Sequence, residues 1–109
     1  MANTYLMSTT IIPSGANGMW MVESLTQGWA ATIASQGFIS AVGHESTASI
    51  MAELLEVPVE ANRITVQPEP GDRFLCFKLD QRPPEGAILD REQLQELGAS
   101  WVLMQYVSR

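Results

Sequence analysis

The only histidine of this chain lies where a predicted strand meets a predicted helix. His44 follows the apolar run 38–42 and Gly43, and it precedes Ser46 and Thr47. The first backbone N–H groups of a helix, with the positive end of its dipole, favour a phosphate at such a junction. His44 would therefore place a titratable imidazole beside an anion site. The simpler alternative is that His44 is only a polar capping residue.

A second group of candidates lies on a proline-rich stretch further along. Gln81 and Arg82 precede a pair of prolines, and Glu85 follows them. Arg82 is suited to stabilise the charge that develops on a phosphorane, while His44 is suited to protonate the leaving oxygen. Glu85 would accept the proton of an attacking 2′-hydroxyl or simply orient Arg82. These residue types suit metal-free cleavage of an RNA-type phosphodiester, in which alignment of the 2′-hydroxyl matters most. The alternative for Arg82 and Glu85 is a plain surface ion pair.

Composition limits both the fold and the partners. Residues 1–109 are expected to form one domain. Six basic residues against twelve acidic ones give a net charge of −6, which argues against a protein that coats DNA or RNA. No apolar run has the length of a membrane span and no signal peptide is evident, so we expect a cytoplasmic protein without a membrane partner. Cys76 is expected in the core, and a lone cysteine excludes a thiolate metal site.

Periodicity predicts an α/β domain with a mixed sheet of about five or six strands flanked by helices. Strands are expected over 4–7, 19–22, 38–42, 63–67, 74–79 and 100–107. Helices are expected from a Ser24–Gln27 capping box to Gly37, over 47–56 before Pro58, and from an Asp90–Gln93 capping box to Gly98. The strands 63–67 and 74–79 flank the turn 68–72, so they are predicted to form a hairpin.

Four segments of the chain resemble the viral ring nuclease family. They are 41–47 (Ala-Val-Gly-His-Glu-Ser-Thr), the Asn-Arg-led strand 62–66, the Gly-Asp pair 71–72, and the stretch 81–86. They occur in the same order over most of the chain. Members of that family are type III anti-CRISPR proteins of archaeal viruses, phages and mobile elements. The resemblance implies a homodimer that binds cyclic tetra-adenylate and cleaves it to linear di-adenylates without metal or cofactor. In a virus-encoded protein this activity would inhibit type III CRISPR immunity in the host cytoplasm.

The resemblance also implies roles for single residues. The catalytic residues would be His44, Arg82 and Glu85. The substrate-binding residues would be Ser8, Thr9, Gly43, Ser46, Thr47, Arg63 and Gln81. The chain departs from the family at residues 8–10. Many relatives have an asparagine close to this position, where this chain has Ser-Thr-Thr. Taken without the resemblance, Ser46 would be a plain N-cap and Arg63 would only bridge a strand and a helix.

Two other classes of function are compatible with these residues. The chain could sequester a cyclic nucleotide without cutting it, or it could be a viral interaction protein that blocks a host partner. Binding alone does not need a general acid, so histidine, arginine and glutamate together favour an enzyme. Trp20, Trp29 and Trp101 lie in apolar patterns and are expected in the core or at a dimer interface.

Overall fold

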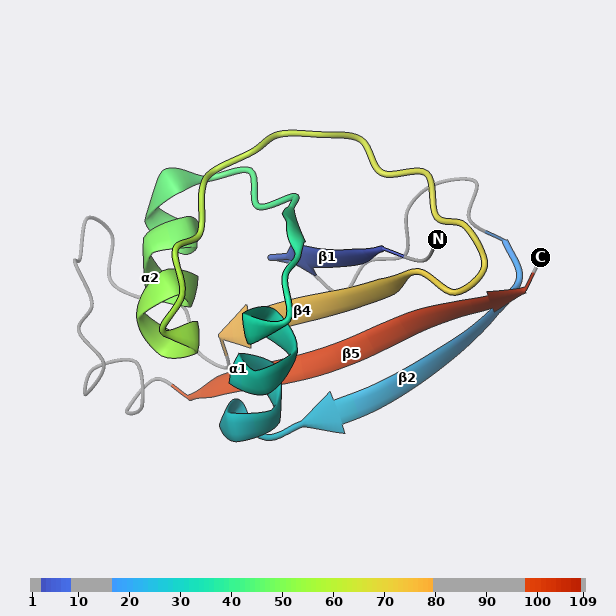
Figure 1. Cartoon of the computed structure of the whole chain (residues 1–109), viewed down its shortest axis with the longest axis horizontal. Coiled ribbons are helices and arrows are strands. Elements are labelled where there is room, and N and C mark those ends of the chain that lie inside the picture. Colours follow the sequence, from blue (N-terminus) through green and yellow to red (C-terminus); the bar gives the residue numbers. More distant parts are fainter. Residues whose placement is uncertain (1–2, 9–16, 80–97, 109) are drawn as a thin grey trace.

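The computed structural model describes residues 3–8, 17–79 and 98–108, which form a five-stranded mixed sheet and two helices (Figure 1). The elements in chain order are β1 (Thr4–Met7), β2 (Met19–Leu25), α1 (Gln27–Ser35), β3 (Ile39–Ser40), α2 (Glu45–Leu55), β4 (Arg73–Leu79) and β5 (Ala99–Ser108). The strand order is β2-β5-β4-β1-β3. Strand β1 is parallel to β3 and β4, whereas β5 is antiparallel to β4 and β2. The predicted α/β class and mixed sheet are confirmed.

Both helices pack on one face of the sheet. Alternate strand residues point to this face because side chains alternate along a strand. The buried residues of this core are Leu6, Leu75, Phe77 and Trp101 from the sheet, Val42 from the loop after β3, and Ala30, Ile33, Ala34, Ala48, Met51, Leu54 and Leu55 from the helices. The indole N–H of Trp101 donates to Gln27 Oε1 at 2.7 Å, so this buried ring keeps a polar partner. The predicted apolar stripe of α2 is confirmed.

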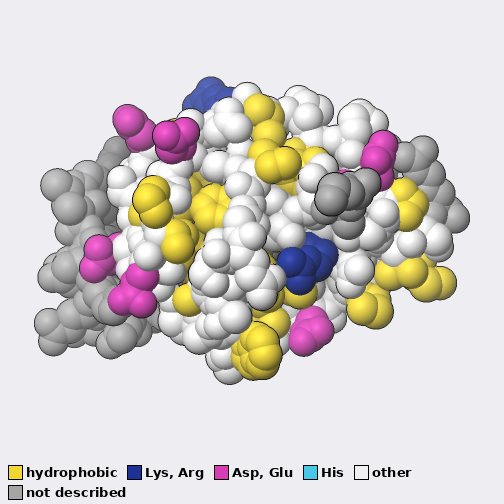
Figure 2. Space-filling view, in the orientation of Figure 1, with side chains coloured by type: hydrophobic (Ala, Val, Ile, Leu, Met, Phe, Trp, Pro, Cys, Tyr) yellow, Lys and Arg dark blue, Asp and Glu magenta, His cyan; other side chains and the backbone are white. Residues whose placement is uncertain are grey.

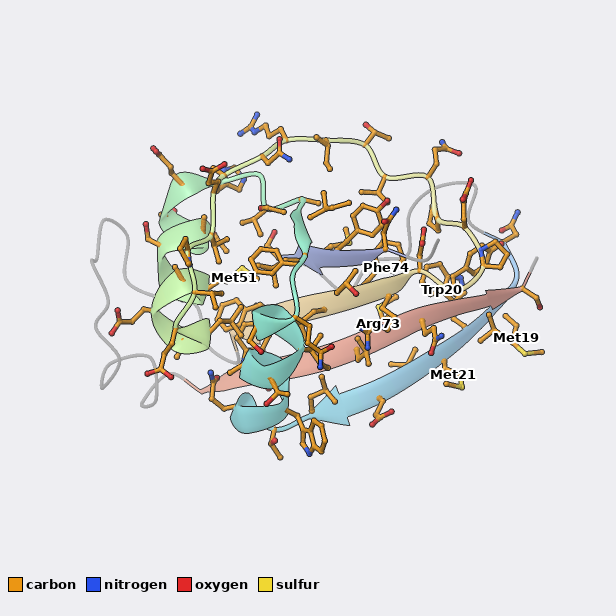
Figure 3. The ribbon with its side chains drawn as sticks, viewed as in Figure 1. Met19, Trp20, Met21, Met51, Arg73 and Phe74 are labelled. Atoms are coloured by element: carbon orange, nitrogen blue, oxygen red, sulfur yellow. The ribbon has the colours of Figure 1, made fainter. Side chains whose placement is uncertain are left out.

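The opposite face of the sheet carries a second, aromatic cluster, of which Figure 3 labels Trp20 and Phe74. Tyr5 stacks on Phe74 at 5.2 Å between ring centroids, and Trp20 stacks on Tyr106 at 4.8 Å. Cys76 is buried in this cluster, as predicted, and burial raises the pKa of its thiol to about 12. Trp101 is a core residue, but Trp29 is 63 % exposed and does not belong to the core of this chain.

The predicted start of α1 is wrong. Ser24 lies within β2, opposite Val102, because this strand continues to Leu25. The helix is capped instead by Thr26, whose side chain accepts a hydrogen bond from the backbone N–H of Trp29 at 3.2 Å. The predicted stop is confirmed, since Gly37 follows the helix with a φ of 103°.

Helix α2 begins slightly earlier than predicted, at Glu45. It ends at Leu55 because Glu56 adopts the left-handed conformation, with a φ of 58°, and Pro58 follows shortly afterwards. The third predicted helix, from 90 onwards, lies outside the described residues. Neither of the two helices described is long and apolar enough to cross a membrane.

The predicted hairpin of 63–67 with 74–79 is wrong. Residues 63–67 form no strand, and β4 is already paired on both sides, with Phe74 opposite Tyr5 of β1 and Met104 of β5. The segment 57–72 instead runs as an irregular extended chain along the β1 and β3 side of the sheet (Figure 1). The predicted turn at its end is confirmed at residues 70–71.

Candidate functional site

Two of the described candidates, Ser8 and His44, follow the carboxyl ends of parallel strands. Leu6 of β1 pairs with Ser40 of β3, and the N–H of Ala41 donates to the carbonyl of Leu6 at 2.9 Å. The carboxyl ends of these strands therefore lie at the same end of the sheet, where ligands of α/β proteins commonly bind. Ser8, which is exposed, directly follows β1, and His44 lies a few residues beyond β3.

His44 occupies the N-cap position of α2, but its imidazole does not act as a cap. The residue has an extended backbone, with φ −129° and ψ 133°, and its side chain makes no capping hydrogen bond. Only its backbone carbonyl takes part in the helix, by accepting the N–H of Ala48 at 3.0 Å. The side chain is exposed. The imidazole therefore does not cap the helix, and neither of its ring nitrogens has a hydrogen-bond partner among the described residues.

The first turn of α2 presents backbone N–H groups beside His44. The first N–H groups of any helix have no acceptor within it, and no described side chain caps those of Glu45, Ser46 or Thr47. Ser46 is exposed within the helix and is not its N-cap, so that alternative is wrong. The turn can bind an anion through its N–H groups, although the exposed carboxylate of Glu45 weakens the local attraction.

Asn62 fixes the loop that leads from β3 to the histidine. Its backbone N–H donates to the carbonyl of Val42 at 2.7 Å, and its side-chain amide donates to the carbonyl of Ser40 at 2.8 Å. The hydroxyl of Ser40 in turn donates to the carbonyl of Glu60 at 2.6 Å. The segment 57–72 is thus bonded to the end of β3, where its own irregular backbone finds partners.

Arg63 continues this connection to the residue before the histidine. Its Nε donates to the carbonyl of Gly43 at 2.9 Å. Gly43 and Arg63 lie close together, since a Cβ built at Gly43 would lie 3.4 Å from the arginine Cγ, in ordinary van der Waals contact. Arg63 therefore connects the segment 57–72 to the loop between β3 and α2, and does not join a strand directly to a helix. Its terminal guanidinium nitrogens have no partner among the described residues, so they can also bind a phosphate.

Four candidates lie outside the described residues, namely Thr9, Gln81, Arg82 and Glu85. Strand β4 is parallel to β1 and ends at Leu79, so its carboxyl end lies at the same end of the sheet as Ser8. In sequence, Gln81 follows Leu79 after one intervening residue. Among the described residues, no group of histidine, cysteine, aspartate and glutamate side chains could hold a metal ion.

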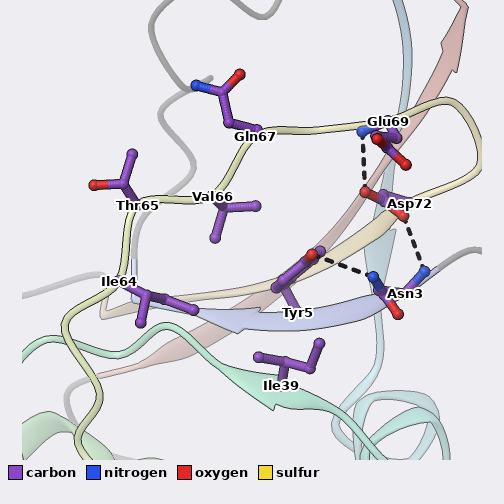
Figure 4. A pocket seen from close by; sticks show the side chains of 9 residues that line it. All are labelled: Asn3, Tyr5, Ile39, Ile64, Thr65, Val66, Gln67, Glu69 and Asp72. Atoms are coloured by element: carbon purple, nitrogen blue, oxygen red, sulfur yellow. Dashed lines mark hydrogen bonds between the residues drawn. The ribbon is translucent and has the colours of Figure 1, made fainter.

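A pocket that the sequence did not predict lies beside the segment 57–72 (Figure 4). Its volume is about 440 Å³. It is lined by Asn3, Tyr5, Ile39, Ile64, Thr65, Val66, Gln67, Glu69 and Asp72. The carboxylate of Asp72 accepts the backbone N–H groups of Asn3 at 2.9 Å and Glu69 at 3.0 Å, and so holds the pocket's end together. The sequence pattern of residues 63–67 predicts a strand paired with 74–79, and residues paired in that way would not line a pocket.

The sequence profile of the STIV B116-like family matches residues 4–101. The chain is also 35% identical over 75 residues to uncharacterized protein 26 of Sulfolobus islandicus filamentous virus, an alignment that covers 68% of this chain and 64% of that protein. It is 31% identical over 109 residues to uncharacterized protein ORF117 of Acidianus two-tailed virus, covering 96% of this chain and 92% of that one.

The fold is also found in a solved structure. B116 of Sulfolobus turreted icosahedral virus matches with a TM-score of 0.80 and 19% sequence identity, and the match covers 95% of this chain and 99% of that one. A bacterial relative, uncharacterized protein YddF of Bacillus subtilis, is 32% identical over 65 residues, or 60% of each chain.

Proposed function

The chain belongs to the STIV B116-like family, and we propose that it is a metal-independent ring nuclease that cleaves cyclic tetra-adenylate to linear di-adenylates. The observation that carries this proposal is the environment of His44. Its exposed imidazole makes no capping bond, and it stands at the N-terminus of α2 beside N–H groups that have no acceptor in the described part of the chain. Cleavage of a phosphodiester requires two features, an anion site for the phosphate and a proton donor for the departing oxygen.

The reaction uses a nucleophile that the substrate carries. The 2′-hydroxyl attacks the neighbouring phosphorus and loses its proton, and the bond from phosphorus to the 5′-oxygen breaks. His44 gives a proton to the 5′-oxygen, which leaves a 5′-hydroxyl on one product end and a 2′,3′-cyclic phosphate on the other. Such general acid catalysis is typically worth about 10²–10⁴-fold in rate. Glu85 receives the 2′-hydroxyl proton or orients Arg82.

The phosphate is held by short contacts. The N–H groups of Ser46 and Thr47 and the terminal nitrogens of Arg63 bind its oxygens, and Arg82 stabilises the added charge of the phosphorane. Gly43 keeps the loop compact, Ser8 and Thr9 contact the ligand at the end of β1, and Gln81 does so after β4. Charge on the rest of the protein does not attract the ligand, because the chain carries a net −6.

A two-fold symmetric ring fits a homodimer with an isologous interface. Two copies of His44, Arg82 and Glu85 would face opposite phosphates, so two cuts would release two di-adenylates. The relatives in archaeal viruses support a role against the host. In that setting the enzyme removes a second messenger in the host cytoplasm and so inhibits type III CRISPR immunity.

The test is incubation of the protein with cyclic tetra-adenylate in the presence of EDTA, with products resolved by chromatography. We expect conversion to di-adenylates, retained in Gln36→Ala, a change at the exposed C-cap of α1, and lost in His44→Ala. An intact ring that stays bound would replace this proposal by sequestration. No binding at all would leave an interaction protein.

A further inference from the structure

The two edges of the sheet differ in what covers them. The β3 edge is bonded to the segment 57–72 through Ser40 and Asn62. The other edge is β2, and no strand in the described part of the chain pairs with its outer side. Proteins commonly protect such an edge with lysine, proline or a bulge, because its open backbone groups pair readily with another chain. Here a bulge occurs between Met19 and Trp20, and the strand continues regularly to Leu25.

The hydrogen bonds of β5 show which groups of β2 face outward. Tyr106 exchanges both of its backbone bonds with the β4 side, donating to Asp72 at 3.0 Å and accepting from Gly71 at 2.7 Å. Paired residues of antiparallel strands alternate between bonded and non-bonded positions. Trp20 and Tyr106 therefore form a pair that exchanges no backbone hydrogen bonds between β2 and β5. Two and four residues further along, the backbone N–H and carbonyl groups of Val22 and Ser24 point away from β5.

Side chains along this edge divide into two kinds. On the helix side, Met21 and Leu25 flank the exposed carboxylate of Glu23. A groove of about 480 Å³ lies between β2 and α1, and its lining includes Glu23, Leu25, the exposed Trp29 and the cation Arg73. On the other side lies Val22, which is 64 % exposed. Figure 3 shows Met19 and Met21 along β2, at the side of the sheet away from β1. Figure 2 shows hydrophobic side chains at the same border of this face.

We propose that the outer edge of β2 binds an extended, basic peptide segment of a partner protein as an additional strand. The Val22 and Ser24 backbone groups supply the ladder, as in other cases of strand addition. Lysine or arginine on the helix side would lie opposite Glu23, with its aliphatic stem on Met21 or Leu25. Apolar residues on the other side would cover Val22. The net charge of −6 favours a basic partner.

The probe is the synthetic peptide Val-Lys-Val-Lys-Val-Lys-Val, capped at both ends and titrated into the isotope-labelled full chain. We expect the amide signals of Val22 and Ser24 to shift and their hydrogen exchange to slow. Val22→Pro should abolish binding and leave the circular dichroism unchanged, because the N–H that it removes does not bond to β5. Glu23→Lys should weaken binding roughly two- to five-fold, as expected for a lost cross-strand charge pair, whereas Glu60→Lys, which makes the same charge change on the exposed segment 57–72, should not.

Three results would overturn the proposal. One is the absence of binding at millimolar peptide, and another is equal binding of the Val-Glu version of the peptide. The third is concentration-dependent slowing of exchange at Val22 and Ser24 without peptide, which would show that the edge pairs with a second copy. If Val22→Pro does not fold, the comparison of Glu23→Lys with Glu60→Lys still decides, since equal affinities would exclude β2 as the site.

Discussion

The Nε of Arg63 donates a 2.9 Å hydrogen bond to the carbonyl of Gly43, the residue before the histidine. This bond ties the segment 57–72 to the loop between β3 and α2, directly before the start of the helix. The terminal nitrogens of the same guanidinium have no partner among the described residues. One side chain can therefore position His44 through Nε and bind a phosphate through its fork.

Arg63→Ala should lower both stability and ligand affinity. Loss of the bond to Gly43 should reduce the free energy of unfolding by about 1 kcal/mol. Affinity for cyclic tetra-adenylate should fall further than in Arg63→Lys, which keeps the charge but lacks the fork. Urea unfolding and calorimetric titration measure the two effects, with Arg109→Ala as the control for charge. Unchanged affinity in Arg63→Ala would remove this residue from the ligand site.

Replacing His44 should separate catalysis from folding. Because the imidazole is exposed and makes no capping bond, His44→Ala should leave thermal stability and ligand binding nearly intact. The cleavage rate should fall by about a hundredfold or more. His44→Ser gives a sharper comparison, since serine at an N-cap stabilises a helix by about 0.5–2 kcal/mol relative to alanine. We expect His44→Ser to be more stable than His44→Ala and equally inactive. A fully active His44→Ser protein would exclude the imidazole as the acid.

Arg82 should matter for both binding and rate, whereas Arg91 should matter for neither. Arg82 is the cation assigned to the charge of the phosphorane, so Arg82→Ala removes a contact that strengthens during the reaction. Arg91→Ala removes the same charge from a nearby part of the chain and serves as its matched control. Single-turnover cleavage and calorimetry test both variants. Equal losses in the two would mean that general charge, and not a positioned guanidinium, supports the ligand.

Helix positions could be predicted from the sequence where apolar periodicity and a helix-stop residue are both local signals. The apolar stripe of α2 and the glycine after α1 correspond to a buried helix face and a positive-φ helix stop. The position of His44 before a helix could also be inferred, because strand and helix patterns meet there. That the imidazole makes no capping bond could not be inferred, since capping is decided by side-chain geometry that residue types do not determine.

Residues 63–67 show the limit of such inference. Their alternation of apolar and polar residues is typical of a strand, but a strand needs a neighbour with an open edge. Both sides of β4 are taken by β1 and β5, and these are long-range pairings that no local pattern reports. Ile64 consequently stays 43 % exposed, and the segment lines a pocket instead of joining the sheet.

Asp72 should contribute to stability through its carboxylate. Its side chain is only 3 % exposed and accepts the backbone N–H groups of Asn3 and Glu69. In Asp72→Asn one of these N–H groups would face an NH₂ group, and a buried unsatisfied donor costs about 1–3 kcal/mol. Urea unfolding should show a loss of this size, with the exposed Glu69→Gln as a control for lost charge. Equal stability of Asp72→Asn and the parent chain would mean that a single acceptor suffices to hold the turn.

Cys76 should make the fold less stable in alkali. Burial raises the pKa of its thiol from the ordinary 9.0 to about 12. Between these values the unfolded chain ionises and the folded chain does not, so the thiol's contribution is fully present below pH 9 and is lost as the pH rises. The loss approaches about 1.4 kcal/mol for each pH unit in that window.

The measurement is the free energy of unfolding in urea at several pH values between 8 and 11, for the parent chain and for Cys76→Ala. The two proteins share every other ionisable side chain, so the difference between the two slopes isolates the thiol. The alanine variant starts lower because of the small cavity beside Met104, but its stability should decline less steeply above pH 9. Parallel declines would show that the Cys76 thiol ionises as readily in the folded protein as in the unfolded chain.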